Sequence, residues 1–356
     1  MCADCENIQV FECHSGNELV ALAVLGLGSI RRRHLVTSRQ LVLSQSANRE
    51  RNVLVEFNEL LCRRGHEAEA TRQLLLKALN CPECDELQVS YGPEEMWIRH
   101  ATAYKGVRGV VDWASRSWSA PLSTETTVQS LLSTLSSSRR SQLRRTLREF
   151  EKDGPLSLSS AATKDEALEY FHRLGDLHTQ RWLKEGVRGS FSNPMWKSFH
   201  VALIKKGFDA GAIQLLRITS GNAEIGYIYN FIWRGAVLML QTGFLRNSQN
   251  VRRSGYVSHL LAMQFNGRLG MREYDFLPGD YEYKRVLGKQ GRTYVSIRFQ
   301  RKNLKFTVEN AAVWCVRRIR SAASRLRLAK PLSKHTLLGL LAFTPPVYQE
   351  VLALLA

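Results

Sequence analysis

The chain has 356 residues, 44% hydrophobic and 23% charged, which is typical of a globular protein and excludes a disordered or fibrous one. Fifty Lys and Arg against 32 Asp and Glu leave a net charge of +18, so the surface should attract polyanions: phosphates, nucleic acid or an acidic membrane face. Seven cysteines in a chain of this size indicate reduced thiols, and residues 1–16 lack the basic start of a signal peptide, so we predict a cytoplasmic protein. The apolar runs 19–30 and 337–343 are too short for a membrane-spanning helix, which needs roughly 20 residues.

The first 120 residues are predicted to form a small α/β unit. Runs of β-favouring residues predict strands at 8–13, 18–25, 39–43, 86–91 and 107–113. Ser15-Gly16-Asn17 and Gly26-Leu27-Gly28-Ser29 separate the first of these, and we interpret both as hairpin turns. Apolar residues at helical spacing predict a helix over 67–79. A Ser/Thr-rich linker and an arginine-rich helix then occupy 121–152.

A second unit is predicted over residues 153–300. Helical patterns cover 164–185, 194–206, 256–270 and 281–287. Three runs at 212–219, 225–233 and 237–244 are separated by Ser220-Gly221-Asn222 and Arg234-Gly235, which is typical of an antiparallel meander. Residues 301–356 hold ten Lys or Arg and two acids, so we expect a basic helical tail with further helices around Pro345-Pro346.

A candidate phosphate site lies between the run ending at Phe244 and the helix that follows. The segment Arg252-Arg253-Ser254-Gly255-Tyr256-Val257 places two arginines and a glycine at a predicted helix N-terminus, where free N–H groups and partial positive charge favour an anion. A solvated loop with a turn glycine is the alternative.

Three segments together resemble acetyltransferases of the GNAT superfamily, of the cellulose-biosynthesis (CelD/BcsL) type, with a distant likeness to Fem-type peptidyltransferases. They are Leu177–Trp182 with 186–191 after it, the Arg252–Val257 turn, and Tyr274–Asp280 running into Tyr283-Lys284. The resemblance covers about residues 10–300, includes the arginine-rich helix, and implies an α/β fold of two tandem GNAT-like domains with mixed, mostly antiparallel sheets flanked by helices.

The resemblance implies that the second domain binds acetyl-CoA or another acyl-CoA. The pantetheine of the donor would lie between two splayed strands and its pyrophosphate at the turn. Val257 stands where the family has a small residue. The cofactor-binding residues expected on this basis are Gln241, Gly243, Arg252, Arg253, Ser254 and Gly255.

Acyl transfer needs a base, an oxyanion partner and an acid for the leaving thiolate. We predict Asp280 or Glu282 as base, Tyr283 as acid and Lys284 as electrostatic partner. Asp280 is equally suited to cap the helix that follows, and Tyr283 to the core.

The acceptor is expected to contact His178, Arg181 and Trp182, which lie three and four residues apart and so share a helix face. Packing of the histidine on the tryptophan, with a surface arginine, is the alternative. Two CxxC pairs, Cys2/Cys5 and Cys81/Cys84, formally make a zinc set, but their separation favours unrelated thiols, and we predict no metal.

The predicted function is transfer of an acetyl or other acyl group from acyl-CoA to an amine or hydroxyl of a sugar or another small acceptor, as in polysaccharide biosynthesis. One alternative is a Fem-like transferase that uses aminoacyl-tRNA; apart from that tRNA we expect no nucleic-acid partner. The other is a non-catalytic protein that binds a polyanion or a membrane surface. The basic tail could hold the protein at the inner face of an acidic membrane.

Overall fold

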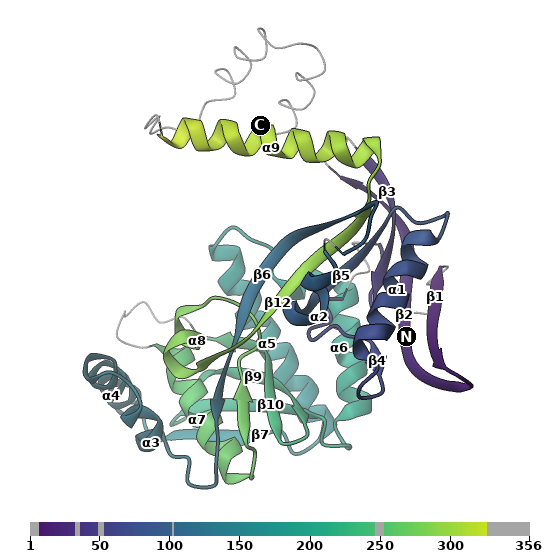
Figure 1. The fold of residues 1–356 in the computed structure, drawn as a ribbon. Helices are drawn as coiled ribbons and strands as arrows, with labels where there is room; N and C mark the ends of the chain where they lie inside the picture. Colours follow the sequence, from purple (N-terminus) through teal and green to yellow (C-terminus); the bar gives the residue numbers. More distant parts are fainter. Residues whose placement is uncertain (1–6, 33–35, 49–52, 102, 246–252, 326–356) are drawn as a thin grey trace. The chain divides into compact units, whose positions relative to one another are not determined.

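The structure is a computed structural model that describes residues 7–32, 36–48, 53–101, 103–245 and 253–325 (Figure 1). The chain forms two compact units. Unit 1 comprises Met1–Arg49, Phe57–Trp113 and Val295–Ala356, and unit 2 comprises Glu50–Glu56 and Ala114–Tyr294. Unit 2 is therefore inserted into the sequence of unit 1, whereas the sequence analysis placed the two domains in succession, at 1–120 and 153–300, with a linker between them and a tail after them. Both units are α/β, with mostly antiparallel strands flanked by helices, as predicted.

Unit 1 has the strand order β1-β2-β3-β5-β12-β6. Its elements are β1 (Ile8–Ser15), β2 (Glu18–Arg32), β3 (Val36–Leu43), β4 (Leu61–Cys62), α1 (Glu67–Asn80), β5 (Glu86–Pro93), α2 (Glu94–Trp97), the 3-10 turn η2 (Ile98–His100), β6 (Val107–Pro121), β12 (Lys289–Arg301) and α9 (Leu304–Arg325). Strands β1, β2 and β3 form an antiparallel meander, and β5 runs parallel to β3 over three residue pairs. Strands β6 and β12 extend beyond the boundary of unit 1, at Trp113 and Val295 respectively.

Strand β2 passes straight through a segment that the sequence predicted as a turn. It pairs with β1 and with β3 on either side of Gly26 and Gly28, so the turn predicted at Gly26–Ser29 is wrong. A Cβ on Gly26 would lie 2.3 Å from the carbonyl oxygen of Gln45, and one on Gly28 would lie 2.7 Å from the Cβ of Ala47. The glycines therefore allow the segment after β3 to cross the strand closely, which is a known use of glycine inside a strand.

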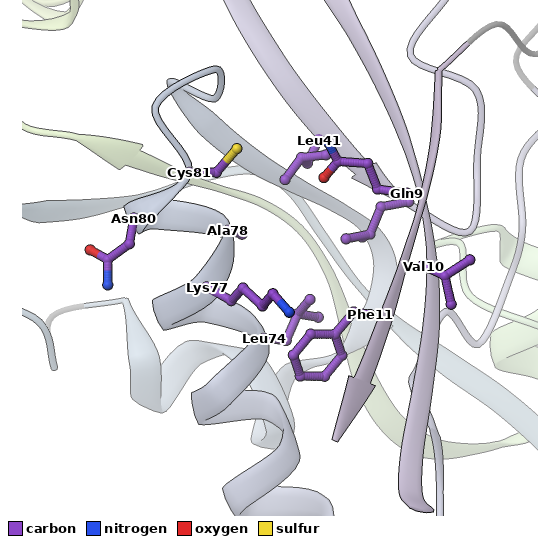
Figure 2. A pocket seen from close by; sticks show the side chains of 10 residues that line it. Gln9, Val10, Phe11, Leu41, Leu74, Lys77, Ala78, Asn80 and Cys81 are labelled. Atoms are coloured by element: carbon purple, nitrogen blue, oxygen red, sulfur yellow. The ribbon is translucent and has the colours of Figure 1, made fainter. Parts of the chain in front are cut away.

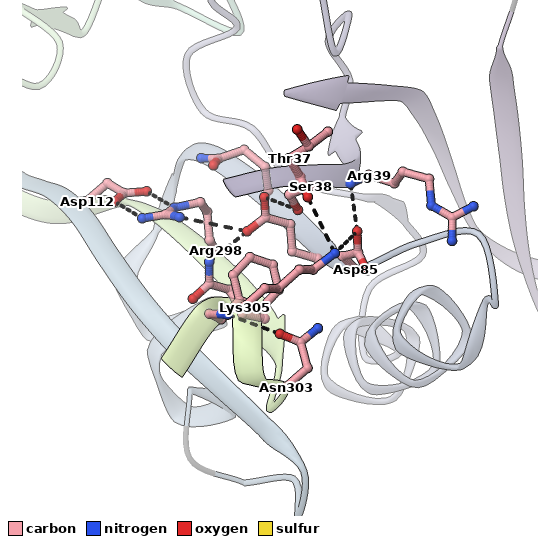
Figure 3. Close-up of polar contacts among 12 residues, drawn as sticks. Thr37, Ser38, Arg39, Asp85, Asp112, Arg298, Asn303 and Lys305 are labelled. Atoms are coloured by element: carbon pink, nitrogen blue, oxygen red, sulfur yellow. Dashed lines mark hydrogen bonds and ion pairs between the residues drawn. The ribbon is translucent and has the colours of Figure 1, made fainter. Parts of the chain in front are cut away.

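A buried polar network joins four strands of unit 1. The fully buried carboxylate of Glu86 accepts hydrogen bonds from Ser38 Oγ and Gln300 Nε2, both at 2.9 Å. Arg298 donates two bonds to Asp112, at 2.6 and 2.7 Å (Figure 3). A buried carboxylate without partners is costly, so Glu86 of β5 favours keeping its bonds to β3 and β12. The bonds from Arg298 to Asp112 join β12 to β6.

Helix α9 follows β12 directly. Phe306 is buried, whereas Leu304, Val308 and Trp314 are exposed, and Lys305 forms an ion pair of 2.6 Å with Asp85. No helix in the described ranges is long and apolar enough to cross a membrane. The helices predicted around Pro345-Pro346 lie outside the described residues.

Unit 2 has the strand order β6-β11-β10-β9-β8-β7. Its elements are α3 (Val128–Ser133), α4 (Ser137–Glu151), β7 (Leu156–Ser160), α5 (Lys164–Lys184), the 3-10 turn η3 (Ser190–Ser192), α6 (Pro194–Gly207), β8 (Ile213–Ser220), β9 (Ala223–Trp233), β10 (Ala236–Phe244), α7 (Ser254–Arg268), β11 (Glu273–Asp275) and α8 (Glu282–Leu287).

The two faces of this sheet are covered by different helices. Helix α5 packs along β8, β9 and β10, and α7 packs against β7, β9 and β10. In β8, Leu215 belongs to the core beside α5, while its neighbour Leu216 belongs to the core beside α7. Successive side chains of a strand point to opposite faces, so this fully buried pair shows that the sheet is covered on both sides.

Unit 2 repeats the element order of unit 1. Three antiparallel strands are followed by a helix and by a strand parallel to the third: β8, β9, β10, α7 and β11 correspond to β1, β2, β3, α1 and β5. The predicted meander is confirmed within one to two residues. Its turns fit because Gly221, Arg234 and Gly235 have φ of +55°, +48° and +80°, which glycine-containing hairpin turns require.

Candidate active site

A pocket of about 460 Å³ lies in unit 2 where β10 ends and α7 begins. Four segments contribute to it: α5, the end of β10, the first turns of α7, and the stretch from Tyr281 into α8. The lining residues are His178, Arg181, Thr242, Gly243, Phe244, Leu245, Arg253, Ser254, Gly255, Tyr256, His259, Tyr281, Glu282 and Tyr283.

The pocket is adjacent to the place where two parallel strands separate. Strands β10 and β11 pair only from Ala236 to Leu238, opposite Glu273 to Asp275. The next residues of β10 continue to pair with β9, with a register shift between Met239 and Gln241. Past this irregularity, the stretch from Thr242 to the end of β10 lines the pocket.

The N-terminus of α7 forms one wall of the pocket. Arg253 is at the N-cap position, and its guanidinium lies 5.9 Å from the centre of the Tyr256 ring. Ser254 Oγ donates to the carbonyl of Leu245 at 2.9 Å, which ties the start of the helix to the strand. The first turn of α7 has no acidic residue. Arg252, predicted to bind the cofactor, lies outside the described residues.

The glycines of this wall are explained by close packing. A Cβ on Gly243 would lie 2.4 Å from the carbonyl oxygen of Leu174, so glycine lets β10 approach the backbone of α5. Gly255 faces the ring of Phe244, at 3.3 Å from the position of a Cβ. Val257, which occupies the position of a small residue in the resembling family, is fully buried in the core beside α7 and does not line the pocket.

The predicted acceptor residues lie together on α5, with different contacts. Trp182 Nε1 donates to His178 Nε2 at 2.7 Å, so the neutral ring of His178 carries its proton on Nδ1. Burial and the nearby Arg181 lower the pKa of His178 to about 4, so this ring is uncharged at neutral pH. Gly189 leaves room for the pair, since a Cβ there would lie 2.4 Å from His178.

Of these three residues, His178 and Arg181 line the pocket and Trp182 does not. The Arg181 guanidinium lies 5.2 Å from the Trp182 ring and pairs with Glu185 at 3.5 Å. Gln241 also does not line the pocket: its amide donates to Ser190 Oγ at 3.4 Å. Trp182 therefore orients the His178 ring through its hydrogen bond without lining the pocket, and the Gln241 side chain points toward η3.

Aromatic rings form the opposite wall. The His259 and Tyr283 rings are stacked with centres 4.9 Å apart, and Tyr281 lies 6.1 Å from Tyr283. Burial lowers the pKa of His259 to about 3 and raises that of Tyr283 well above its usual range. At neutral pH the imidazole is therefore neutral and the Tyr283 phenol keeps its proton.

The two acidic candidates are placed differently. Glu282 lines the pocket and forms an ion pair with Arg139 of α4. Asp280 is exposed, pairs with Arg285 and does not line the pocket. The N-cap of α8 is Tyr281, without a side-chain cap, so the alternative of Asp280 as a helix cap is wrong.

Lys284 is buried behind the pocket. Its ammonium donates to the carbonyls of Leu277 and Pro278 at 3.1 and 3.0 Å, and the side chain is not part of the lining. The adjacent Tyr283 points its ring to the pocket because successive residues at the start of α8 face different sides of the helix.

Sequence reasoning missed several lining residues. Tyr256 and His259 lie three positions apart at the start of α7, on one helix face, and this spacing could have revealed them. Tyr281 precedes the predicted pair Tyr283-Lys284 and carries no signal of its own. Glu56, an electrostatic partner of Lys284, is more than 200 residues away in sequence and could not have been found.

No cluster of three or more His, Cys, Asp or Glu suited to a metal ion occurs among the residues that the structure describes. Of the two CxxC pairs, Cys2 and Cys5 lie outside the described residues. The thiol of Cys84 is buried and donates to the carbonyl of Glu86 at 3.0 Å, and the Cys81 thiol is free.

A second pocket, of about 510 Å³, lies in unit 1 between α1 and strands β1 to β3. Its walls include Phe11, Leu41 and Leu74, which are at most 4% exposed, and Lys77 extends across it from α1 (Figure 2). The described residues that line it include no carboxylate and no histidine, so it offers neither of these side chains as a general base.

Comparison with known protein families agrees with this geometry. Residues 137–285 match the acetyltransferase (GNAT) domain family. The match begins with α4 and ends in α8, so it contains the pocket residues described above. Unit 2 therefore contains a stretch that is similar to the GNAT acetyltransferase domain family. No curated protein matches the chain in sequence.

Three solved structures show the same fold at low sequence identity. One is the C-terminal domain of a protein from Agrobacterium fabrum assigned as a lysylphosphatidylglycerol synthetase (11% identity, 86% of this chain and 88% of that chain, TM-score 0.50). Another is FemX (11% identity, 85% and 90%, TM-score 0.50). A third is a conserved protein of unknown function from Bacteroides thetaiotaomicron (8% identity, 79% and 83%, TM-score 0.50). The fold is GNAT-like with a relation to the Fem-type fold, as predicted.

Proposed function

We propose that the pocket of unit 2 binds an acyl-CoA and that its residues transfer the acyl group to an amine or hydroxyl of a sugar or another small acceptor. The observation that carries the proposal is the meeting of the α7 N-terminus, Arg253 and the separated end of β10 in a single pocket. The match of residues 137–285 to the GNAT acetyltransferase family supports it.

The donor phosphates would be held at the start of α7. The first N–H groups of a helix have no partners within the helix and carry partial positive charge. Ser254 and Gly255 provide such groups here, and the Arg253 guanidinium can add a charge-assisted bond. An acid in this turn would oppose the anion, and none is present.

Transfer would join the acceptor nitrogen or oxygen to the acyl carbon and break the bond from that carbon to sulfur. The acceptor loses a proton and the departing thiolate gains one. Tyr283 lines the pocket with a phenol that is protonated at neutral pH, and it is our candidate to protonate the thiolate. Glu282 is the carboxylate of the pocket lining and is our candidate to accept the acceptor's proton. Asp280, which points elsewhere, is not used.

Titration with acetyl-CoA, combined with an assay for released thiol, tests the proposal. Wild type should bind acetyl-CoA in the micromolar range, and Arg253→Ala should weaken binding about tenfold because it removes one charge-assisted bond. Arg268→Ala, at the other end of α7 and exposed, is the matched control and should leave affinity unchanged. Absence of wild-type binding would refute the acyl-CoA proposal.

Aminoacyl-tRNA is the second candidate donor, and the arginines of α4 favour it. Arg144, Arg145 and Arg148 are exposed and have no ion pair in the described part of the chain. Arg139, on the same helix, pairs with the pocket residue Glu282. Helix α4 thus reaches the pocket through Arg139, and its exposed arginines could bind a phosphate backbone. A solvated helix face is the alternative.

Binding of charged tRNA distinguishes the two donors. If tRNA is the donor, charged tRNA should raise the melting temperature while acetyl-CoA does not, and Arg144→Ala with Arg145→Ala should weaken tRNA binding and reduce its salt dependence. If acyl-CoA is the donor, the double variant should keep wild-type thiol release.

Membrane contact through the basic tail and a purely polyanion-binding role remain predictions. The exposed Leu304, Val308 and Trp314 of α9, next to basic residues, are a composition that suits an anionic membrane surface. Salt-sensitive binding to vesicles of phosphatidylglycerol, with no thiol release from acetyl-CoA, would favour the non-catalytic reading.

A further inference from the structure

Lys284 is buried and does not reach the pocket in which a ligand would bind. Its side chain is 5% exposed, and its ammonium donates to the carbonyls of Leu277 and Pro278 at 3.1 and 3.0 Å. It does not line the pocket. The two hydrogen bonds point the ammonium at the turn that precedes α8, and this turn is its immediate structural partner.

That turn has a strained backbone. Leu277 has φ of +63°, a left-handed conformation that is costly for a branched side chain, and Gly279 has φ of +133°. The N–H of Leu277 donates to Asp275 Oδ1 at 2.7 Å. A Cβ on Gly279 would lie 3.2 Å from the Lys284 nitrogen. Such a conformation persists only when surrounding groups hold it, and Lys284 bonds the carbonyls of two successive peptide units, those of Leu277 and Pro278.

The turn leads directly into the aromatic wall of the pocket. Tyr281 follows it by two residues, and its ring lies 5.6 Å from the Lys284 nitrogen. Tyr281 and Tyr283 both line the pocket, and the Tyr283 ring is stacked on His259. The position of these rings therefore depends on the conformation that Lys284 holds.

A buried ammonium needs negative charge nearby. Glu56, from the short segment of residues 50–56 that belongs to unit 2, and Asp275 are its electrostatic partners. The Glu56 Oε2 atom is buried and has no hydrogen-bond partner among the described residues. Burial raises the pKa of Glu56 to about 7 and lowers that of Lys284 to about 8, and each group opposes the shift of the other.

We propose that Lys284 is a positioning residue: its buried ammonium, balanced by Glu56 and Asp275, holds the strained turn at residues 277–279 and thereby sets Tyr281 and Tyr283 in the pocket wall. Its importance for turnover rests on the function proposed above. The structural part of the proposal does not, because the turn can be measured in the protein without ligand.

Hydrogen exchange in the ligand-free full chain tests the structural part. In Lys284→Met, amides of residues 276–284 should exchange at least tenfold faster than in wild type, while amides of α5 keep their protection. Lys289→Met, an exposed lysine at the start of β12, is the matched control and should exchange as wild type. Unchanged exchange at residues 276–284 in Lys284→Met would overturn the proposal.

Glu56→Gln provides a second, milder variant should Lys284→Met fail to fold. It keeps size and polarity but removes the counter-charge, and exchange at residues 276–284 should accelerate about threefold. Glu59→Gln, on an exposed neighbour, is its control. Wild-type exchange in Glu56→Gln would contradict the role of Glu56 and, if Lys284→Met is unfolded, the proposal as a whole.

Turnover separates positioning from direct catalysis. A positioning role predicts that Lys284→Met and Glu56→Gln lower turnover in the order of their effect on exchange, with little change in acetyl-CoA affinity at the α7 N-terminus. Loss of turnover with wild-type exchange would instead make Lys284 a catalytic residue. If wild type releases no thiol at all, the acyl-transfer function fails, and the exchange results still decide the structural proposal.

Discussion

The helices α1 and α7 occupy equivalent positions in the two units, yet their N-termini differ in charge. Helix α1 carries Glu67 and Glu69 in its first turn, and the Glu67 carboxylate accepts a bond from the N–H of Gly65 at 2.8 Å. Helix α7 has no acid in its first turn and lies beside Arg253. In unit 1 the first turn of the helix carries two acids that would repel an anion, and in unit 2 the first turn carries none.

The shared topology of the two units is not sufficient to form a donor-binding site. Both units have three antiparallel strands, a helix and a parallel strand, and in both the parallel pairing extends over three residue pairs. In unit 2, Arg253, Tyr256 and His259 line a pocket at the start of the helix. The pocket of unit 1 is largely apolar. This difference favours a single donor site, in unit 2.

The largest effect on acetyl-CoA binding is expected from placing an acid in the first turn of α7, as in the first turn of α1. Gly255→Asp places a carboxylate where the donor pyrophosphate would lie, and we expect acetyl-CoA affinity to fall about a hundredfold or more, near 3 kcal/mol. Calorimetric titration measures it. Gly255→Ala controls for the added Cβ against Phe244 and should cost only a few-fold. Equal affinities for Gly255→Asp and Gly255→Ala would place the phosphates elsewhere.

Acid should also destabilise the core of unit 2, through a buried histidine. His200 in unit 2 is 3% exposed, and burial lowers its pKa to about 4. Because the folded-state pKa lies below the unfolded value of about 6.5, its contribution to stability is complete above pH 6.5 and is lost as the pH falls toward 4. We expect the difference in unfolding free energy between wild type and His200→Phe to change by roughly 2–3 kcal/mol between pH 7 and pH 4.

Urea unfolding at several pH values measures this difference. The raised pKa values of Glu56 and Asp275 change stability with pH in the opposite direction, but they do so equally in wild type and His200→Phe and therefore cancel in the difference. The exposed His172 of α5 offers the control His172→Asn, which should leave the pH dependence as it is in wild type. A pH-independent difference for His200→Phe would mean that His200 is not held in its neutral form.

A closely packed glycine in each unit offers a matched pair of substitutions. Alanine at Gly243 would bring Cβ to 2.4 Å from the Leu174 carbonyl oxygen in unit 2, and alanine at Gly26 would bring it to 2.3 Å from the Gln45 carbonyl oxygen in unit 1. We expect each to cost about 2 kcal/mol of stability through overpacking, as measured by thermal unfolding. Only Gly243→Ala should also weaken acetyl-CoA binding, and an equal loss in Gly26→Ala would contradict the assignment of the site to unit 2.

The smallest effect is expected from removing one of the two acids in the first turn of α1. Glu67→Gln leaves Glu69 in that turn, and the segment before the helix pairs Arg63 with Glu18 at 2.5 Å. Stability should change by about 0.5 kcal/mol, and no second acetyl-CoA site should appear in titration. A second site would show that charge alone separates the two units.

Local signals made unit 2 predictable from the sequence. Helix α5 was placed within one residue, because Thr163 caps it with a bond to the Glu166 N–H and apolar residues follow at helical spacing. The start of α7 was placed within two residues, because arginine and glycine precede a helical pattern. These features are contained in short stretches of chain, where spacing and turn chemistry decide the conformation.

Contacts between distant segments could not be predicted. Gly26 and Gly28 signal a turn by themselves, and only the segment 45–47 crossing over them explains why the strand continues. Likewise, the pairing of Lys284 with the turn at Leu277 and the approach of Glu56 depend on tertiary packing. Sequence reasoning therefore identified the residues near the site but gave Lys284 a different place.

The insertion of unit 2 within unit 1 has a consequence for the order of folding during synthesis. Strand β12 lies between β5 and β6 in the sheet order, and Val295, Ile297 and Phe299 complete the core that contains Leu41 and Leu87. Trp113 therefore leaves the ribosome about 180 residues before Val295, where β12 enters unit 1. Unit 2, in contrast, is continuous from Ala114 to Tyr294 apart from the short segment Glu50–Glu56. Domains generally fold as units as they emerge, so the nascent N-terminal strands must wait with an unfinished apolar face, and a chaperone would find its binding surface there.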